Sequence, residues 1–171
     1  MKRILVLAFL CTLGLAAIFA EDPVTQLRAA SPWIAADSTV VALADGTWKV
    51  SDNVNLPFVN DPGVVGPWTA VDWVKDPADF LPGSPKFTGE LYWSKIEFLP
   101  GGATKGLFGS FTNTFNTWTK GLYLGTNPSE PTASHYTIQT IANQGYLFVE
   151  WKSGDYTLRA KKPGYYVFKK D

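Results

Sequence analysis

The residues able to do acid–base or metal chemistry are few in this chain of 171 residues. His135 is its only histidine, and Cys11, its only cysteine, lies in an apolar N-terminal stretch. A zinc site needs several such ligands, so these counts argue against one. Asp72, Asp76 and Asp79 surround a loop and could offer oxygen ligands to calcium, although turn-forming and capping roles account for them more simply. We therefore expect no metal and no other cofactor.

Two carboxylates near the C-terminus, Glu150 and Asp155, have the residue types of a glycosidase pair. However, Asp155 belongs to the turn sequence KSGDY, and Arg159 offers Glu150 a closer partner across the predicted strands. His135 stands in the predicted strand ASHYTI, where a wall or rim position is the simpler role. No glycine-rich phosphate-binding loop occurs in the sequence. The sequence therefore predicts a protein that is not an enzyme.

The first twenty residues have the pattern of a secretory signal peptide. Lys2 and Arg3 precede an uncharged apolar stretch from Ile4 to Phe19, and Ala20 stands before the acidic sequence EDP. A membrane anchor would usually have a longer apolar run. We expect cleavage after Ala20, export to the periplasm, the cell surface or the extracellular space, and no membrane span in the mature protein.

Cleavage would remove the only cysteine and two of the 15 basic residues, leaving 13 against 15 acidic residues and a formal net charge near −2. Without a thiol, the mature chain must be held together by its hydrophobic core, and about 150 residues are enough to build one. Nucleic acid is not expected as a partner, because binding phosphates needs concentrated positive charge.

The composition favours short strands joined by tight turns, since aromatic residues make up 15% of the chain and it has 15 glycines and 12 prolines. Apolar or alternating segments follow one another from residue 64 to the C-terminus with short connections. We therefore predict an all-β fold, an antiparallel, lipocalin-like barrel of about eight to nine strands, over residues 61–171. Residues 21–60 form an extended N-terminal arm ahead of it.

Local signals refine this prediction. In the arm, the Asp45-Gly46 dipeptide between the apolar segments Thr39–Ala44 and Thr47–Val50 indicates a hairpin. The segment Pro77–Phe80, capped by Asp76, fits one short helical turn. The sequence KFTGELYWSKIEFL is predicted to form one long strand.

Two turn signals in the last stretch, from Gly145 to Asp171, predict two successive hairpins. One is a two-residue turn within KSGDY, and the other is a type II turn at Pro163-Gly164. The resulting register places an apolar set on the core face: Leu147, Val149, Trp151, Tyr156, Leu158, Ala160, Tyr165 and Val167. Lys152 and Lys161 are predicted to be exposed.

The opposite face of these hairpins mixes aromatic and charged residues, which suits either an outer wall or a ligand site. As a ligand site, Arg159 would hold an anionic group, because its planar guanidinium matches a carboxylate. Tyr166 and Phe168 would lie beside it, with Glu150 and Phe148 on the same face. Because Glu150 can pair with Arg159, a surface ion pair is the alternative for this arginine.

The sequence Gly66-Pro67-Trp68 at the start of the first barrel strand resembles the lipocalin signature. In that family the tryptophan closes one end of the barrel, and a basic residue from a late strand lies over it. The resemblance implies that Trp68 is the barrel-closing residue, with Arg159 or Lys169 over its ring in a cation–π contact.

A longer part of the chain, from about Asn55 to Asp171, resembles the C-terminal extracellular domains of BlaR-type antirepressor membrane proteins of bacteria, and their secreted stand-alone relatives. The sequences EWKSGDY and KPGYYV carry most of this resemblance. The His-Glu-x-x-His and Ser-x-x-Lys motifs of the BlaR-type peptidase and penicillin sensor are not in this sequence, so neither proteolysis nor β-lactam acylation is implied. The resemblance implies an exported, barrel-like sensory module of the cell envelope.

Three functions fit these observations. The leading prediction is a secreted, non-enzymatic barrel that binds a small amphipathic or anionic ligand. A carbohydrate- or cell-wall-binding module would instead use an exposed aromatic platform drawn from Trp73, Trp93 and Trp118. A third alternative is an interaction domain whose aromatic face docks on another envelope protein.

Overall fold

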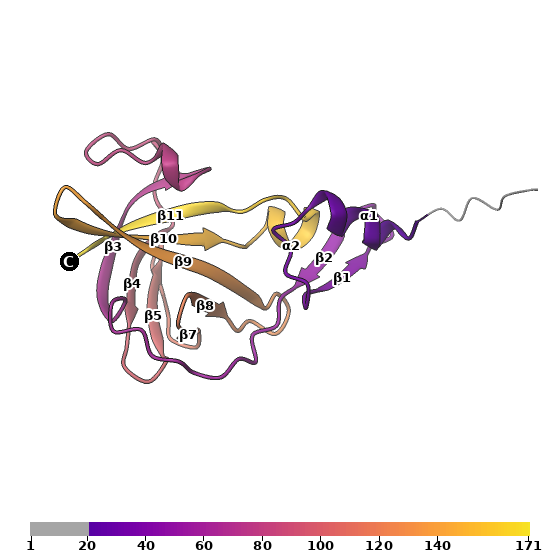
Figure 1. Ribbon diagram of the computed structural model, residues 1–171, viewed down its shortest axis with the longest axis horizontal. Helices are drawn as coiled ribbons and strands as arrows, with labels where there is room; N and C mark the ends of the chain where they lie inside the picture. Colours follow the sequence, from indigo (N-terminus) through magenta and orange to yellow (C-terminus); the bar gives the residue numbers. More distant parts are fainter. Residues whose placement is uncertain (1–20) are drawn as a thin grey trace, which may run out of the picture.

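The computed structural model describes residues 21–171, so the predicted signal peptide lies outside the described residues. Nine antiparallel strands form one sheet that curls into a half-barrel (Figure 1). Their order across the sheet is β6-β5-β4-β3-β11-β10-β9-β8-β7. The predicted all-β, antiparallel, barrel-like fold is therefore confirmed. Within residues 21–171, no helix combines the length and apolarity needed to cross a membrane.

The sheet consists of two meanders that meet where the first of its strands, β3, pairs with the last, β11. Short turns connect most of its neighbouring strands. The strands are β3 (Gly66–Val74), β4 (Trp93–Phe98), β5 (Thr104–Phe108), β6 (Phe111–Asn113), β7 (Thr117–Thr119), β8 (Leu122–Gly125), β9 (Thr132–Ile141), β10 (Gln144–Trp151) and β11 (Gly164–Lys170).

The two edge strands, β6 and β7, are consecutive in the chain, and the sheet partly closes near them. The backbone N–H of Trp118 donates to the carbonyl of Gly102 at 2.8 Å, and that of Thr104 donates to the carbonyl of Asn116 at 3.2 Å. The turn before β5 thus pairs with the start of β7. This closure satisfies backbone groups that an open sheet edge would leave unpaired.

Aromatic rings fill the inner face of the sheet. Trp93 lies among five other rings, whose centroids are between 4.9 Å (Tyr123) and 5.9 Å (Trp151) from its own. The outer face carries a smaller cluster that includes Tyr146 and Phe148, and Phe80 packs edge-on against both rings. Both faces of β10 are therefore covered, which explains why an almost continuous apolar run is stable in this strand.

The loop from β3 to β4 is held by the buried carboxylate of Asp72. This carboxylate accepts backbone hydrogen bonds from Trp73 (2.8 Å), Lys86 (2.9 and 3.0 Å) and Phe87 (2.9 Å). The single long strand predicted for KFTGELYWSKIEFL is therefore wrong in its first half. The N–H groups of residues 86 and 87 bind Asp72 instead of a neighbouring strand, and β4 begins only at Trp93.

Two of the predicted local elements are confirmed. The short 3₁₀ helix η1 (Pro77–Asp79) begins with proline, and the Asp76 side chain accepts a hydrogen bond from Ala78 N at 3.0 Å. In the arm, β1 (Thr39–Ala42) and β2 (Trp48–Ser51) pair as a hairpin. Gly46 in its connection has a φ of +80°, a conformation that glycine adopts readily.

The arm also contains a helix, α1 (Pro23–Ala30), that was not predicted. Its start signals are Asp22, whose side chain accepts a hydrogen bond from Thr25 N, and a proline at the first helical position. Figure 1 shows α1, β1 and β2 of the arm at one end of the molecule, beside a second helix, α2 (Asp155–Arg159). Together they enclose a small core of Ile34, Val50, Tyr156 and Ala160.

The predicted hairpin at KSGDY is wrong, because residues 155–159 form α2 instead of a strand. Residues 152–163 leave the sheet to reach the arm, and β10 pairs directly with β11. Leu158, predicted to be buried, is 45% exposed, whereas Lys152, predicted to be exposed, is buried. Arg159 pairs with Asp155 on its own helix.

The insertion of α2 also changes which face of β11 points into the barrel, compared with the prediction. Val149 is paired with Tyr166, and Leu147 with Phe168. Tyr166 and Phe168 therefore lie in the inner core, while Val167 packs on the outer face with Phe148. A shift of one residue in a strand exchanges its two faces, which accounts for the error in β11, whereas Leu147 and Val149 lie on the inner face as predicted.

Asp72 provides a test of this architecture. We expect Asp72→Ala to lower the free energy of unfolding by about 3 kcal/mol, because several backbone donors would lose a charged, buried acceptor. Chemical denaturation measures this loss. Asp76→Ala is the matched control and should cost about 1 kcal/mol, the usual value of a helix cap. Equal losses in the two variants would show that Asp72 does not organise the loop.

Candidate functional site

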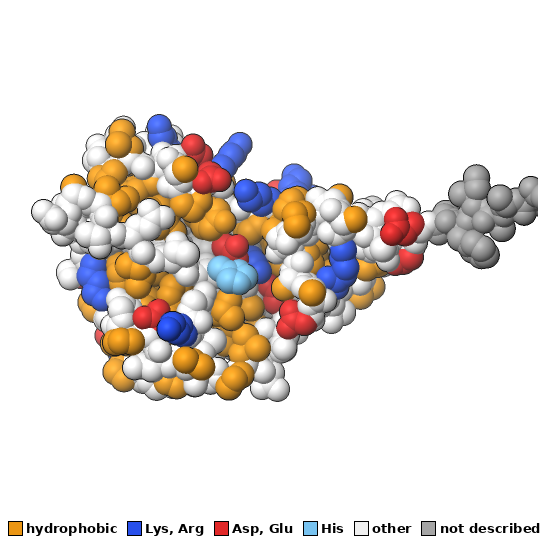
Figure 2. Space-filling model, in the orientation of Figure 1, with side chains coloured by type: hydrophobic (Ala, Val, Ile, Leu, Met, Phe, Trp, Pro, Cys, Tyr) orange, Lys and Arg blue, Asp and Glu red, His pale blue; other side chains and the backbone are white. Residues whose placement is uncertain are grey.

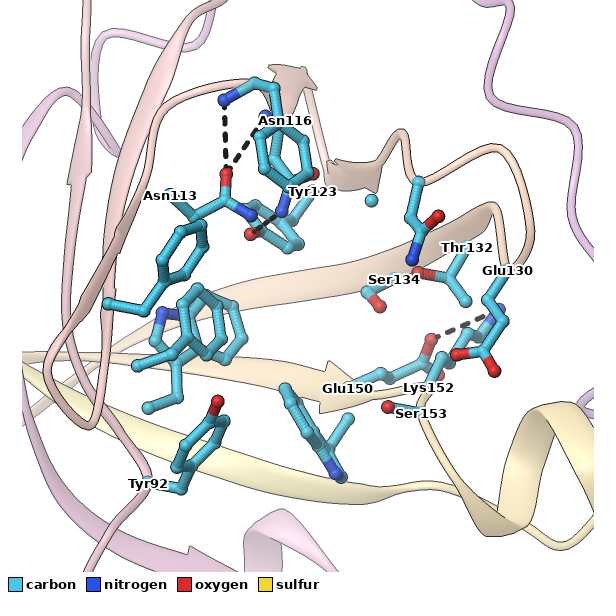
Figure 3. A pocket seen from close by; sticks show the side chains of 17 residues that line it. Tyr92, Asn113, Asn116, Tyr123, Glu130, Thr132, Ser134, Glu150, Lys152 and Ser153 are labelled. Atoms are coloured by element: carbon cyan, nitrogen blue, oxygen red, sulfur yellow. Dashed lines mark hydrogen bonds and ion pairs between the residues drawn. The ribbon is translucent and has the colours of Figure 1, made fainter.

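A cavity of about 230 Å³ opens between the ends of the two meanders. Figure 3 shows Tyr92 and Tyr123 on one side of it, with Glu130, Glu150 and Lys152 gathered on the other. The aromatic side is completed by Trp93, Phe108 and Trp151. The cavity is therefore divided into an apolar wall and a polar end.

Three aromatic rings that line the cavity are also open to solvent. Tyr92, Phe111 and Phe115 are 56%, 56% and 54% exposed. Large apolar groups gathered at a concave surface often mark an interaction site, because leaving them in water does not stabilise the fold. We refer to these three residues as the aromatic rim.

Amide side chains brace the loop between β6 and β7 beside the aromatic wall. Asn113 Oδ1 accepts hydrogen bonds from the backbone N–H groups of Phe115 and Asn116, both at 3.2 Å. Asn116 Nδ2 donates to the Tyr123 hydroxyl at 2.5 Å, and its Oδ1 accepts from Thr126 N at 3.1 Å. These contacts hold the rim loop and the apolar wall in fixed positions.

The polar end is built around Lys152, whose side chain is 1% exposed. Its ammonium lies 3.2 Å from Asp52 Oδ2 and 3.7 Å from Glu150 Oε2, and it donates to the carbonyl of Ala133 at 2.8 Å. A buried ammonium is stable only with such compensation, since removing a charge from water is costly. The ammonium thus donates hydrogen bonds to Asp52 and Ala133 and lies at ion-pair distance from Glu150.

Asp52 connects the arm to this polar end. Its Oδ1 accepts hydrogen bonds from Ser38 Oγ (2.6 Å) and the Tyr156 hydroxyl (2.9 Å), and its Oδ2 accepts from Ala133 N (3.0 Å). Burial and the neighbouring Asp52 charge raise the pKa of Tyr156 far above its ordinary value, so its hydroxyl remains a donor. One carboxylate thus joins the arm, β9, α2 and Lys152.

Glu150 lies between this buried network and the cavity. Its Oε2 accepts a hydrogen bond from His135 N at 2.9 Å and lies 3.1 Å from His135 Nδ1. Figure 2 shows the imidazole at the surface of the molecule, against acidic and basic side chains. The hydrogen bond to Glu150 raises the pKa of His135. Burial alone would raise the pKa of Glu150, but the bonds from His135 and the charge of Lys152 together lower it.

The structure does not bring the five predicted ligand-binding residues together. Glu150 lines the cavity. Tyr166 and Phe168 are buried in the inner core, and Phe148 is buried on the outer face of the sheet. Arg159 lies on α2 with its side chain 59% exposed, and pairs with Asp155 rather than with Glu150.

Trp68 is buried in the inner core, and its indole Nε1 donates to the carbonyl of Val64 at 2.7 Å. Lys170 lies over the indole, with its ammonium 4.5 Å from the ring centroid. The contact thus comes from Lys170 and not from Arg159 or Lys169, because the last strand carries residue 170 to the position opposite Trp68.

The predicted aromatic platform cannot include Trp93 or Trp118, since each is only 1% exposed. Among the described residues, no group of three or more His, Cys, Asp or Glu side chains could hold a metal ion. Asp72 instead binds the loop, and Asp76 caps η1.

Sequence reasoning missed the pair of Asp52 and Lys152 altogether. The two residues are 100 positions apart, and no local pattern links them. A signal for α2 did exist in the sequence. The four-residue spacing of one helix face separates Tyr156 from Ala160, and Asp155 from Arg159.

No protein-family model, curated protein or solved structure matches this chain. The lipocalin and BlaR-type resemblances therefore stay predictions.

The role of Asp52 can be tested by removing its charge. We expect Asp52→Ala to lower the free energy of unfolding by about 3–5 kcal/mol, because Lys152 would lose its closest carboxylate while still buried. Hydrogen exchange should also accelerate in residues 34–52 more than in the sheet.

Two further variants serve as controls for this change. Asp37→Ala alters an exposed carboxylate of the arm and should stay within about 0.5 kcal/mol of the parent protein. The double variant Asp52→Ala/Lys152→Met should recover part of the lost stability, since no unpaired buried charge remains. A loss below about 1 kcal/mol for Asp52→Ala would contradict the anchoring role.

The contact between His135 and Glu150 predicts a pH-dependent contribution to stability. Because the folded pKa of His135 is raised above its ordinary value of 6.5, the contribution is complete below pH 6.5 and is lost as the pH rises through the folded pKa. His135→Gln should therefore destabilise the protein more at about pH 5 than at about pH 8. Denaturant titrations at the two pH values measure this difference, and an equal effect at both would contradict the prediction.

Proposed function

We propose that the protein is an exported, non-enzymatic module of the cell envelope that binds one small amphipathic ligand in the cavity of the half-barrel. The observation that carries this proposal is the division of one cavity into an aromatic wall with an exposed rim and a charged end. An amphipathic molecule would cover the rim and wall with its apolar part and satisfy the polar end with its other part.

The volume of the cavity is enough to hold about one ring with a short chain. Its volume is about 230 Å³. For comparison, an engineered apolar cavity of roughly 150 Å³ in another protein holds benzene. Aromatic side chains would contribute both area burial and offset or edge-to-face contacts with a flat ligand.

The charged residues of the cavity support a binding role rather than catalysis. The Lys152 side chain is 1% exposed and its ammonium is paired with Asp52, and Glu150 and His135 are bonded to each other. The charged residues of the cavity also favour an amphipathic ligand over an anionic one. Lys152 is the only cation among the described residues that line the cavity, and Arg159 does not line it.

A second candidate, binding of an acidic carbohydrate, is favoured by a separate hollow. This hollow has a volume of about 480 Å³ and is lined by Trp73 and Trp151 together with Lys75, Lys161 and Lys162. Trp73 packs so closely on Gly164 that a Cβ added at residue 164 would lie 2.3 Å from the indole ring of Trp73. Its indole could stack on a sugar while the lysines face carboxylates.

Titration of the exported protein with 2-phenylethanol, followed by tryptophan fluorescence, tests the leading proposal. We expect saturable quenching with a Kd on the order of 1 mM, given the few atoms of this probe. Phe111→Ser or Phe115→Ser should weaken binding several-fold, because each removes part of the aromatic rim.

Leu81→Ser is the matched control, since Leu81 is 56% exposed and does not line the cavity, and its binding should be unchanged. Native mass spectrometry of the protein from its exporting host should also reveal any ligand that is retained. Equal affinities in the rim and control variants would refute the proposal. Quenching by an acidic oligosaccharide that disappears in Trp73→Ala would favour the second candidate instead.

A further inference from the structure

We propose that the polar end of the cavity selects a ligand with a positively charged amine, and that Glu150 Oε1 is the acceptor that holds it. This inference rests on the proposed function and names the chemical class of its ligand. It follows from which donors and acceptors of Lys152 and Glu150 already have partners within the protein.

Lys152 cannot serve an acidic ligand. Its ammonium contacts Asp52 Oδ2, the carbonyl of Ala133 and Glu150 Oε2, and its side chain is 1% exposed. The first two of these accept hydrogen bonds from the ammonium, and Glu150 Oε2 lies at an ion-pair distance of 3.7 Å. A ligand carboxylate would have to break the buried pair of Lys152 and Asp52 to reach the charge.

Glu150 uses only one of its two carboxylate oxygens within the described structure. Oε2 is approached by His135 N, His135 Nδ1 and Lys152 Nζ, whereas Oε1 accepts no hydrogen bond from the described residues. The side chain is 13% exposed, and it lines the cavity. A carboxylate oxygen held in this way is an acceptor for a donor that enters from the cavity.

The charges around Glu150 favour a cation over a neutral donor. Asp52 and Glu150 carry two negative charges against the single positive charge of Lys152 when His135 is neutral. Glu130 adds another carboxylate to the cavity wall, beside Glu150 in Figure 3. Tyr156 and Tyr165, which lie near these groups, both have raised pKa values and stay uncharged.

The aromatic wall suits the same ligand class. Tyr92, Phe108 and Trp151, none of which is fully buried, line the cavity together with Glu150. Aromatic faces attract cations, and this attraction is strongest where water is excluded. An aryl-alkyl amine would therefore place its ring against the wall and its ammonium between the wall and Glu150.

Three probes of similar shape and different charge test this inference: 2-phenylethylamine, 2-phenylethanol and phenylacetate. Binding to the full exported chain is measured by calorimetry at one pH and salt concentration. We expect the amine to bind roughly ten-fold more tightly than the alcohol, the usual advantage of a charge-assisted hydrogen bond, and phenylacetate to bind most weakly.

Glu150→Gln should weaken amine binding roughly ten-fold and strengthen phenylacetate binding, while the alcohol changes little. The substituted amide keeps an oxygen for His135 and presents a donor to the cavity. Glu97→Gln, at a carboxylate of β4 that pairs with Lys105 and does not line the cavity, is the matched control and should change none of the affinities.

The order of affinities of the three probes for the parent protein tests the inference even if Glu150→Gln does not fold. Phenylacetate or the alcohol binding as tightly as the amine would overturn it. If the alcohol still depends on Phe111 and Phe115 in that case, the proposed function stands and only the amine preference fails. Absence of saturable binding by all three probes would overturn both proposals.

Discussion

The buried ion pair of Lys152 and Asp52 is the interaction on which the rest of this structure depends. It joins the residue that follows β10 to the residue that follows β2, across 100 positions of sequence. Two charges removed from water are stable only when each has further hydrogen bonds, and here Ser38, Tyr156 and Ala133 supply them. The pair therefore requires the arm, β9 and α2 to be in place together.

The position of Lys152 also decides which side chains line the interior. To reach Asp52 and the arm core, residues 152–163 leave the sheet, and Tyr156 and Ala160 are buried at a distance from the barrel core. The chain then returns with β11 directly beside β10, so that Tyr166 and Phe168 face inward. The same arrangement keeps Lys152 away from ligands and leaves Glu150 as the charged group that separates the buried network from the cavity.

The parts of the fold that were predictable depend on short-range chemistry. The hairpin around Asp45-Gly46 and the capped turn at Pro77 follow from residues a few positions apart, and the strand-rich composition indicated the fold class. In the region after Trp151, by contrast, a turn signal and a helical spacing compete within the same few residues. Packing of Tyr156 on the arm favours the helix, and that contact is invisible in local sequence. The cavity was not predictable for the same reason, since its lining combines residues from β4, β5, β6, β8, β9 and β10. Of the predicted ligand-binding residues, Glu150 is the one that lines it.

Proton–nitrogen correlation NMR of the lysine ammonium groups tests the central claim most directly. A lysine ammonium that is buried and held by hydrogen bonds and ion pairs exchanges its protons slowly with water, whereas exposed lysines exchange too fast to be seen near neutral pH. The account predicts a visible ammonium signal that disappears in Lys152→Met and persists when phenylacetate is added. An ammonium of Lys152 that exchanges as fast as those of the exposed lysines would contradict it.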